Sequence, residues 1–174
     1  QDTRNRIRVA ADLLDGEIYG LTGDGARLWA DSKGFEKSIV QGRPPFEGAT
    51  DTVGVVARDN SGLIVCATST GGTSNRPPGR VGDVPLPGCG FWAQEGVGVG
   101  ATGIGEAITR GMLSFRVAER ILDGGDLEES MMWALEECLE DGAEVGIIAL
   151  GSEGTGHGLA NSENMPWSSW IARK

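Results

Sequence analysis

Histidine is nearly absent from this chain of 174 residues, which contains only His157. A histidine-based catalytic triad and a metal site with several histidine ligands are therefore poor hypotheses. Cysteine is scarce too: Cys66, Cys89 and Cys138 are widely spaced, odd in number and without a Cys-x-x-Cys pair. This spacing predicts neither a disulfide framework nor a zinc site. We expect no metal, no cofactor and a reducing, cytoplasmic location.

Basic residues are in the minority, with 15 lysines and arginines against 25 acidic residues and a formal net charge of −10. Such a surface lacks the basic contacts that nucleic acids require and repels anionic lipid headgroups, so we expect neither partner. Long apolar runs are missing as well. The long charge-free stretch that includes residues 62–75 contains several Ser, Thr and Gly residues and falls short of the roughly 18 apolar residues of a membrane span.

The N-terminal segment lacks the apolar core of a secretion signal, because Asp12 and Asp15 interrupt it shortly after three arginines. Glycine, by contrast, is abundant, with 29 residues. Even with the 7 prolines, this content stays below the roughly 25–30% that marks low-complexity chains. We expect a folded chain with one domain and a real hydrophobic core.

The hydrophobic periodicity predicts clusters of helices and strands rather than strict alternation. Segments 4–14, 24–37, 106–122 and 127–139 are expected to be helices, and segments 17–21, 52–58, 63–70, 97–101, 144–150 and 157–161 strands. An Asp-Asn-Ser-Gly turn at 59–62 joins two of these strands into a hairpin. Segments 38–51 and 71–90, rich in Gly and Pro, are expected to be loops. This order favours a layered α+β fold over a doubly wound parallel sheet.

One glycine motif is compatible with nucleotide binding. Gly98, Gly100 and Gly103 follow a predicted strand and precede a helix, with Asp123 about twenty residues further on, as in dinucleotide-binding proteins. In a chain so rich in glycine, this spacing arises easily by chance. Glu106, which opens the helix, would also repel a pyrophosphate. The motif therefore does not predict a nucleotide cofactor.

A more specific signal comes from four motifs with small hydroxyls, one Arg and one Asp in glycine-rich turns. They are Asp51–Ala57, Thr68–Gly72, Gly79–Asp83 and Ala101–Glu106. In order and spacing, across residues 51–165, they resemble the family of plant-type asparaginases, isoaspartyl peptidases and glycosylasparaginases. These proteins are N-terminal-nucleophile hydrolases.

A threonine hydroxyl needs a base to become a nucleophile, and the nearest candidate is its own α-amine. An α-amine has a pKa of roughly 7.7–8.0, whereas the amide nitrogen of an internal threonine has no basicity. Thr52 must therefore become an N-terminus. The resemblance implies that it does so by autoproteolysis of the Asp51–Thr52 bond.

The resemblance also assigns roles to the other motif residues. It implies that Thr52 is the nucleophile, that Thr70 orients it, and that Thr102 and the N–H of Gly103 form the oxyanion hole. Arg80 and Asp83 would bind the α-carboxylate and α-ammonium of the substrate, with Gly103 and Gly105 lining the substrate site. Such a pairing is chemically sensible because guanidinium binds carboxylate bidentately. Taken alone, Arg80 and Asp83 are equally compatible with a turn stabilised by their mutual ion pair.

The sequence departs from the family pattern in two respects. Ile104 stands where many relatives have a small polar residue, and the long N-terminal segment of the relatives has no counterpart here. The resemblance implies a four-layer αββα sandwich. Within it, residues 1–51 would be the end of an α-subunit-like segment with its linker, and residues 52–174 the β-subunit-like catalytic segment, together in one domain. A homo-oligomer of paired αβ units is also implied.

The leading hypothesis is an amidohydrolase that acts on the side-chain amide of L-asparagine or on β-aspartyl (isoaspartyl) peptides. Segment 161–165 looks like the asparaginase and isoaspartyl peptidase branch, whereas Asp51 points to glycosylasparagine as the substrate. An unprocessed, inactive domain that serves as a binding or oligomerising module is the alternative from another class.

Overall fold

The computed structural model describes residues 3–39, 50–154, 156–163 and 165–171, and only the backbone of residues 50 and 51. The chain divides into two compact units, residues 1–46 and 47–174. The smaller unit contains α1 (Arg6–Ala11) and α2 (Gly23–Ser32). Both helices are shorter than predicted. The strand predicted at 17–21 is wrong: no strand pairs with this segment among the described residues, and Tyr19 is 99% exposed. Most of the loop predicted at 38–51 lies outside the described residues.

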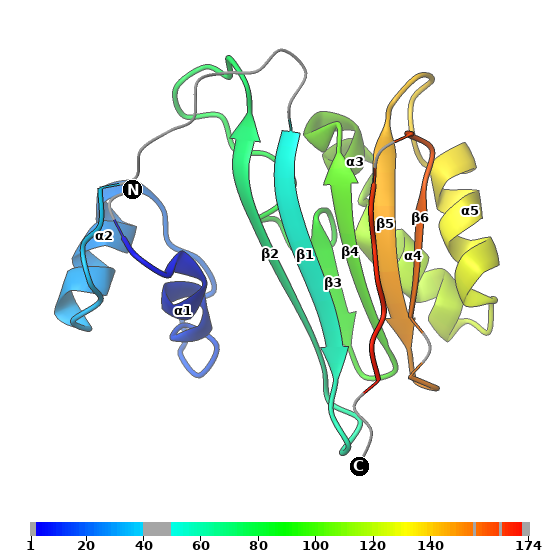
Figure 1. Cartoon of the computed structure of the whole chain (residues 1–174), viewed down its shortest axis with the longest axis horizontal. Coiled ribbons are helices and arrows are strands. Elements are labelled where there is room, and N and C mark those ends of the chain that lie inside the picture. Colours follow the sequence, from blue (N-terminus) through cyan, green and yellow to red (C-terminus); the bar gives the residue numbers. More distant parts are fainter. Residues whose placement is uncertain (1–2, 40–49, 155, 164, 172–174) are drawn as a thin grey trace. The chain divides into compact units, whose positions relative to one another are not determined.

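Among its described residues, the larger unit contains two antiparallel sheets and three helices (Figure 1). The first sheet is the hairpin of β1 (Thr50–Arg58) and β2 (Ile64–Thr73). The second has the order β3-β4-β5-β6, formed by β3 (Phe91–Gln94), β4 (Val97–Gly103), β5 (Val145–Gly151) and β6 (Gly156–Ala160). The helices are α3 (Gly105–Gly111), α4 (Leu113–Leu122) and α5 (Leu127–Glu137). The predicted α+β class is confirmed.

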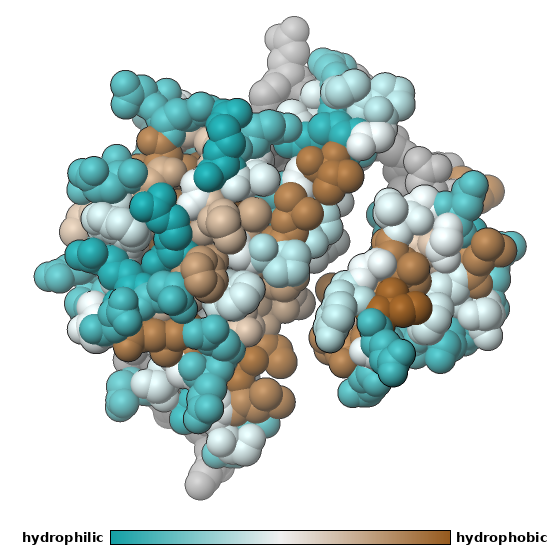
Figure 2. Space-filling view, turned by 180° about the vertical axis from the view of Figure 1, so that it is seen from behind, coloured by the Kyte–Doolittle hydropathy of each residue, from teal (hydrophilic) through white to brown (hydrophobic). Residues whose placement is uncertain are grey.

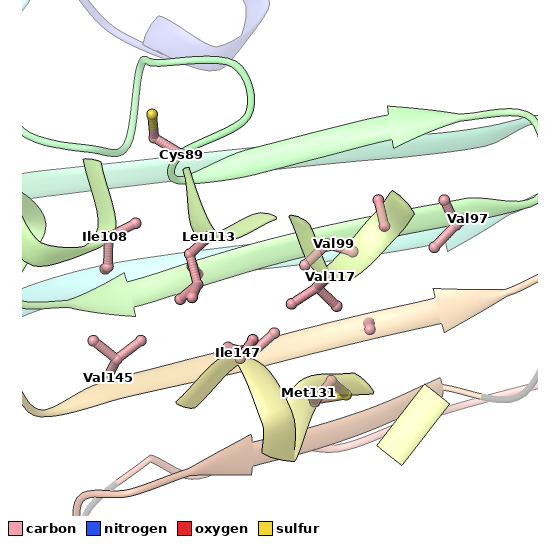
Figure 3. Close-up of a cluster of buried hydrophobic side chains, with 13 residues drawn as sticks. Cys89, Val97, Val99, Ile108, Leu113, Val117, Met131, Val145 and Ile147 are labelled. Carbon is pink, nitrogen blue, oxygen red and sulfur yellow. The ribbon is translucent and has the colours of Figure 1, made fainter. Parts of the chain in front are cut away.

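The four-stranded sheet lies between the hairpin and the helices α4 and α5 (Figure 1). Alternate side chains of β4 and β5 point to opposite faces, as in any strand. On the helical face, Val97, Val99 and Ile147 are fully buried against Leu113 and Val117 of α4 (Figure 3). This face holds the hydrophobic core of the unit.

The opposite face of β4 is built from glycine, which lets the hairpin approach closely. A Cβ atom on Gly98 would lie 2.5 Å from Cγ1 of Val56 and 2.7 Å from Cγ2 of Ile64. A Cβ atom on Gly100 would lie 3.6 Å from the Cys66 sulfur. Gly98 and Gly100 therefore serve the packing of the two sheets, which accounts for the spacing that resembles a dinucleotide motif.

The hairpin turn forms as predicted because Asp59 satisfies its backbone groups. Oδ1 of Asp59 accepts hydrogen bonds from the backbone N–H of Ser61 at 2.8 Å and of Leu63 at 3.0 Å. Gly62 adopts φ +94°, a left-handed conformation that glycine enters without strain. The turn thus fixes the register that pairs β1 with β2.

The continuous helix predicted at 106–122 is wrong, because Met112 breaks it. Met112 adopts φ 45°, ending α3 and beginning α4 in a new direction. The loop before β3 supplies the hydrogen bonds that a continuous helix would have made. The N–H of Phe115 donates to the carbonyl of Gly88 at 2.9 Å, and Oγ of Ser114 donates to the carbonyl of Cys89 at 2.6 Å. Tertiary contacts override the local helical pattern here.

Strand β3 is missing from the sequence prediction. It has only four residues, and it turns directly into β4 through Gly96, which adopts φ +90°. Trp92 of β3 packs edge-on against Phe115 of α4 at 5.1 Å between ring centroids. The sequence feature that could have indicated β3 is the aromatic pair Phe91-Trp92 before a turn with glycine.

The outer face of the hairpin carries apolar side chains. Val53 and Val55 of β1 are 64% and 56% exposed, and Val65 of β2 is 49% exposed. Hydrophobic residues are visible along the hairpin side of the larger unit in Figure 2. Both faces of this hairpin are therefore apolar, which is typical of a strand pair built to be covered on both sides.

Gly98→Ala should destabilise the larger unit, because the added methyl would overlap Val56 and Ile64. Overpacking of this kind costs about 1–3 kcal/mol. The matched control is Gly71→Ala in β2, where no heavy atom outside the neighbouring residues lies within 4 Å of an added Cβ atom. Urea unfolding followed by tryptophan fluorescence measures both. Equal loss in the two variants would contradict the packing role of Gly98.

Candidate active site

Two threonine hydroxyls meet at the start of the hairpin. Thr52 pairs with Thr70 across β1 and β2, and Oγ1 of Thr52 donates a hydrogen bond to Oγ1 of Thr70 at 3.0 Å. Oγ1 of Thr70 also accepts the backbone N–H of Gly72 at 2.9 Å. These contacts fix the rotamer of Thr52. The strand register shifts between Asp51 and Thr52, so a local irregularity falls at the bond predicted to be cleaved.

Thr52 lines a hollow of about 950 Å³ between the hairpin, the second sheet and residues 165–171. Thr102, at the end of β4, lines the same hollow. The structure therefore brings Thr52 and Thr102 to one cavity, although they are fifty positions apart in the sequence.

The turn after Thr102 requires glycine. Gly103 adopts φ +133°, and a Cβ atom there would overlap the carbonyl oxygen of Glu144. The N–H of Ile104 donates to that same carbonyl at 3.0 Å, which anchors the turn to the segment before β5. The backbone at Thr102 and Gly103 is thus held rigidly, with a half-buried Thr102 side chain facing the hollow.

Arg80 does not pair with Asp83. Its guanidinium binds Glu106 at two points, from Nε to Oε1 at 2.9 Å and from Nη2 to Oε2 at 2.8 Å. Within the described part of the chain, no ion pair joins Arg80 to Asp83. Hydrogen bonding to Glu106 raises the pKa of Arg80, and the same bonds lower the pKa of Glu106. A turn stabilised by a mutual Arg80–Asp83 ion pair is therefore not what the structure contains.

Asp83 is a buried carboxylate with an unused oxygen. The residue is 5% exposed, and no described group bonds its Oδ2 atom. Its backbone carbonyl accepts the N–H groups of Leu86 at 2.9 Å and Gly90 at 3.1 Å, which hold the residue in place. Burial is the main reason why the pKa of Asp83 is raised above its ordinary value of 3.8. A cationic ligand group would relieve this desolvation.

Gly105 leaves room for the charged groups of Arg80 and Asp83 at the end of the turn that follows Thr102. A Cβ atom on Gly105 would lie 2.6 Å from Oδ1 of Asp83 and 2.8 Å from Nη2 of Arg80. A side chain at this position would therefore displace both groups. The guanidinium and the carboxylate converge three positions after Thr102 in the chain. Sequence reasoning missed Glu106 as a partner of Arg80, because 26 positions separate them and no spacing rule links the two.

The other singled-out residues lie outside this arrangement. Burial raises the pKa of the Cys66 thiol to about 11, and Sγ donates to the carbonyl of Val99 at 3.4 Å, so Cys66 acts as a packing residue. Nε2 of His157 on β6 lies 3.7 Å from Oε1 of Glu128, and the His157 ring packs in a tilted contact against Trp167 at 5.0 Å between ring centroids.

Among the described residues, no cluster of His, Cys, Asp and Glu could hold a metal ion, and no helix is long and apolar enough to span a membrane.

Comparison with known proteins shows which family the chain is similar to. A family model described as asparaginase matches residues 27–174. A plant-type L-asparaginase from Pyrobaculum calidifontis is 42% identical over 126 residues, which are 67% of this chain and 42% of that protein. An isoaspartyl peptidase/L-asparaginase from Danio rerio is 39% identical over 140 residues, 77% of this chain and 45% of that protein. An isoaspartyl peptidase from Escherichia coli is 40% identical over 118 residues, 66% of this chain and 36% of that protein.

The chain thus spans less than half the length of each of these three relatives. The family match nevertheless covers both strands of the hairpin, the turn that follows Thr102 and the segment with Arg80 and Asp83. The chain belongs to the asparaginase family.

Proposed function

We propose that this chain carries the catalytic centre of an amidohydrolase for the side-chain amide of L-asparagine or for β-aspartyl peptides, with Thr52 as nucleophile. The observation that carries the proposal is the 3.0 Å hydrogen bond between the hydroxyls of Thr52 and Thr70, in a hollow that Thr102 also lines. Relatives named as asparaginases and isoaspartyl peptidases support the substrate class.

Thr52 needs a free α-amine as its base, and autoproteolysis supplies it. In this step the Thr52 hydroxyl attacks the carbonyl carbon of Asp51, and the peptide nitrogen leaves as the amine of Thr52. Water then hydrolyses the resulting ester and releases the carboxylate of Asp51. The register shift between Asp51 and Thr52 supports this site, because the bond lies where the strand pairing is irregular.

The processed enzyme would act in two steps. The amine of Thr52 takes the hydroxyl proton, the oxygen attacks the substrate carbonyl, and the amide nitrogen leaves with a proton. Thr102 and the N–H of Gly103 would stabilise the oxyanion, and water would hydrolyse the acyl-enzyme. The free donors of Arg80 and the unused oxygen of Asp83 suit the carboxylate and ammonium of an amino acid. Gly103 and Gly105 would give the substrate room.

The proposal extends to the assembly of the protein. The apolar outer face of the hairpin supports a four-layer αββα sandwich, since helices would cover that face. Residues 1–51 would then be the end of an α-subunit-like segment and residues 52–174 the catalytic segment, in one domain. Homo-oligomers of paired αβ units and a cytoplasmic location complete the proposal.

Thr52→Ala should abolish both cleavage before position 52 and amide hydrolysis, because the same hydroxyl performs both reactions. Thr52→Ser should retain cleavage. The control is Ser69→Ala, an exposed hydroxyl beside Thr70 on β2. Intact-mass measurement reports the cleavage, and ammonia release from L-asparagine reports the hydrolysis. Hydrolysis by Thr52→Ala within tenfold of the parent would remove Thr52 from the mechanism.

Thr102→Val keeps the shape of the side chain and deletes its hydroxyl. Loss of one oxyanion donor lowers kcat by roughly 10²–10³. KM for L-asparagine should change little, because the donor acts mainly in the transition state. Steady-state kinetics separates the two parameters, and an unchanged kcat would contradict the oxyanion role of Thr102.

Asp83→Asn should stabilise the fold while weakening the binding of an α-ammonium group. Because the pKa of Asp83 is raised in the folded state, ionising it costs stability as pH rises from 3.8 through the folded pKa. The variant should therefore be more stable than the parent at neutral pH, by about 1 kcal/mol, and equal to it below pH 3.8.

Asp59→Asn is the matched control for this experiment. Hydrogen bonds from Ser61 lower the pKa of Asp59, so its ionised form stabilises the turn above pH 3.8. The control variant should lose stability at neutral pH, where Asp83→Asn gains it. Urea unfolding at several pH values measures both, and a loss of stability in Asp83→Asn at pH 7 would contradict a net cost of burying the ionised Asp83 carboxyl.

A further inference from the structure

Glu106 holds Arg80 along one edge of its guanidinium. Oε1 accepts from Nε and Oε2 from Nη2, so the two groups lie side by side in the strong bidentate geometry. The Arg80 side chain is 15% exposed and that of Glu106 is 56% exposed. The carboxylate thus binds the arginine from the solvent side.

The other edge of the guanidinium remains available. Arginine has five N–H donors in a planar fork, and Glu106 accepts from Nε and Nη2. No described residue accepts a hydrogen bond from Nη1. Gly82 and Gly105 make room for the group: Cβ atoms there would lie 2.6 Å from Nη1 and 2.8 Å from Nη2. The free edge has the shape that a second carboxylate requires.

Asp83 shows why this arrangement needs a restraint. Its Oδ2 atom is buried and unbonded among the described groups, although Arg80 is near enough for its charge to act on Asp83. An unrestrained arginine would turn towards such a carboxylate, since pairing relieves the desolvation of the buried charge. That turn would consume both the donors and the acceptor that an amino acid needs. Glu106 competes for the guanidinium and keeps it apart from Asp83.

We propose that Glu106 is a positioning residue, which keeps Arg80 from pairing with Asp83 and so holds both groups ready for the α-carboxylate and α-ammonium of an amino acid. This inference rests on the proposed function. Glu106 does not itself contact the ligand; it acts through the orientation of Arg80. The opposite role, a carboxylate that blocks Arg80 until the ligand displaces it, predicts effects of opposite sign.

Binding of L-aspartate, the acid product of the proposed reaction, tests the inference by calorimetry. Glu106→Gln keeps the size of the side chain and removes the charge that restrains Arg80. Its Kd for L-aspartate should rise roughly tenfold, as expected for the loss of an oriented bidentate contact. The matched control is Glu140→Gln, which removes the same charge from the exposed Arg110–Glu140 pair; Arg110 lies on α3, as Glu106 does. The control should keep the Kd of the parent.

A second measurement needs no ligand. In Glu106→Gln, the released Arg80 should approach Asp83 and lower the pKa of the Asp83 carboxyl. Carboxyl NMR titration detects this, with the Asp83 signal assigned by its loss in Asp83→Asn. A purely structural role of Glu106 would leave the titration of Asp83 unchanged.

The outcomes separate this inference from the proposed function. If the parent neither binds L-aspartate nor hydrolyses L-asparagine, the proposed function fails and the inference fails with it. If the parent binds, but Glu106→Gln binds as tightly or more tightly, the positioning role alone is overturned. An unchanged pKa of Asp83 in Glu106→Gln also overturns it, because Arg80 would then not have moved.

Discussion

The close approach of the hairpin to β4 is the constraint on which the rest of the larger unit depends. Two sheets usually pack about 10 Å apart, with interdigitating side chains between them. Here Gly98 and Gly100 remove the side chains of one strand, so Val56 and Ile64 occupy their space. The hairpin is thereby set at a fixed depth against β4. Thr52 and Thr102 face a common hollow because of that depth.

The arrangement of charged groups at the site reflects a second constraint, the free-energy cost of burying a charged side chain. Asp83 is buried with an unbonded oxygen, whereas Arg80 is satisfied by the exposed Glu106. The separation leaves the desolvation of Asp83 uncompensated among the described residues, which costs stability. Under the proposed function, an amino acid with both charges would relieve that cost when it binds. Such an exchange of stability for binding is common at functional sites.

The sequence predicted the class of the fold, which the structure confirms, and it singled out Thr52, Thr70 and Thr102, which the fold brings together. The hairpin turn at Asp59-Asn-Ser-Gly62 could be predicted because its chemistry is local, and the strands at 97–101 and 144–150 could be predicted from their apolar residues. Thr52 and Thr70 could be matched because both lie in one hairpin with a defined register. Prediction worked where short-range geometry decides the structure.

Prediction from the sequence failed where contacts between distant segments decide the structure. Met112 breaks a segment with a continuous helical pattern, because carbonyls of residues 88 and 89 take the N–H groups of α4. The segment 17–21, predicted as a strand, has no neighbouring strand to pair with in the part of the chain that the structure describes. The partner of Arg80 depended on where α3 begins, so only the folded chain could identify Glu106 instead of Asp83.

The apolar outer face of the hairpin also bears on how the protein behaves in solution. Val53, Val55 and Val65 form an exposed surface on a sheet that has two strands among the described residues, so within this part of the chain both of its edges have unpaired backbone groups. Such a surface favours self-association, and the formal net charge of −10 opposes it by mutual repulsion. That repulsion vanishes near the isoelectric point of about 4.5. The colloidal stability of the protein is therefore governed by its acidic residues, and it should be lowest in the pH range where their charge is balanced.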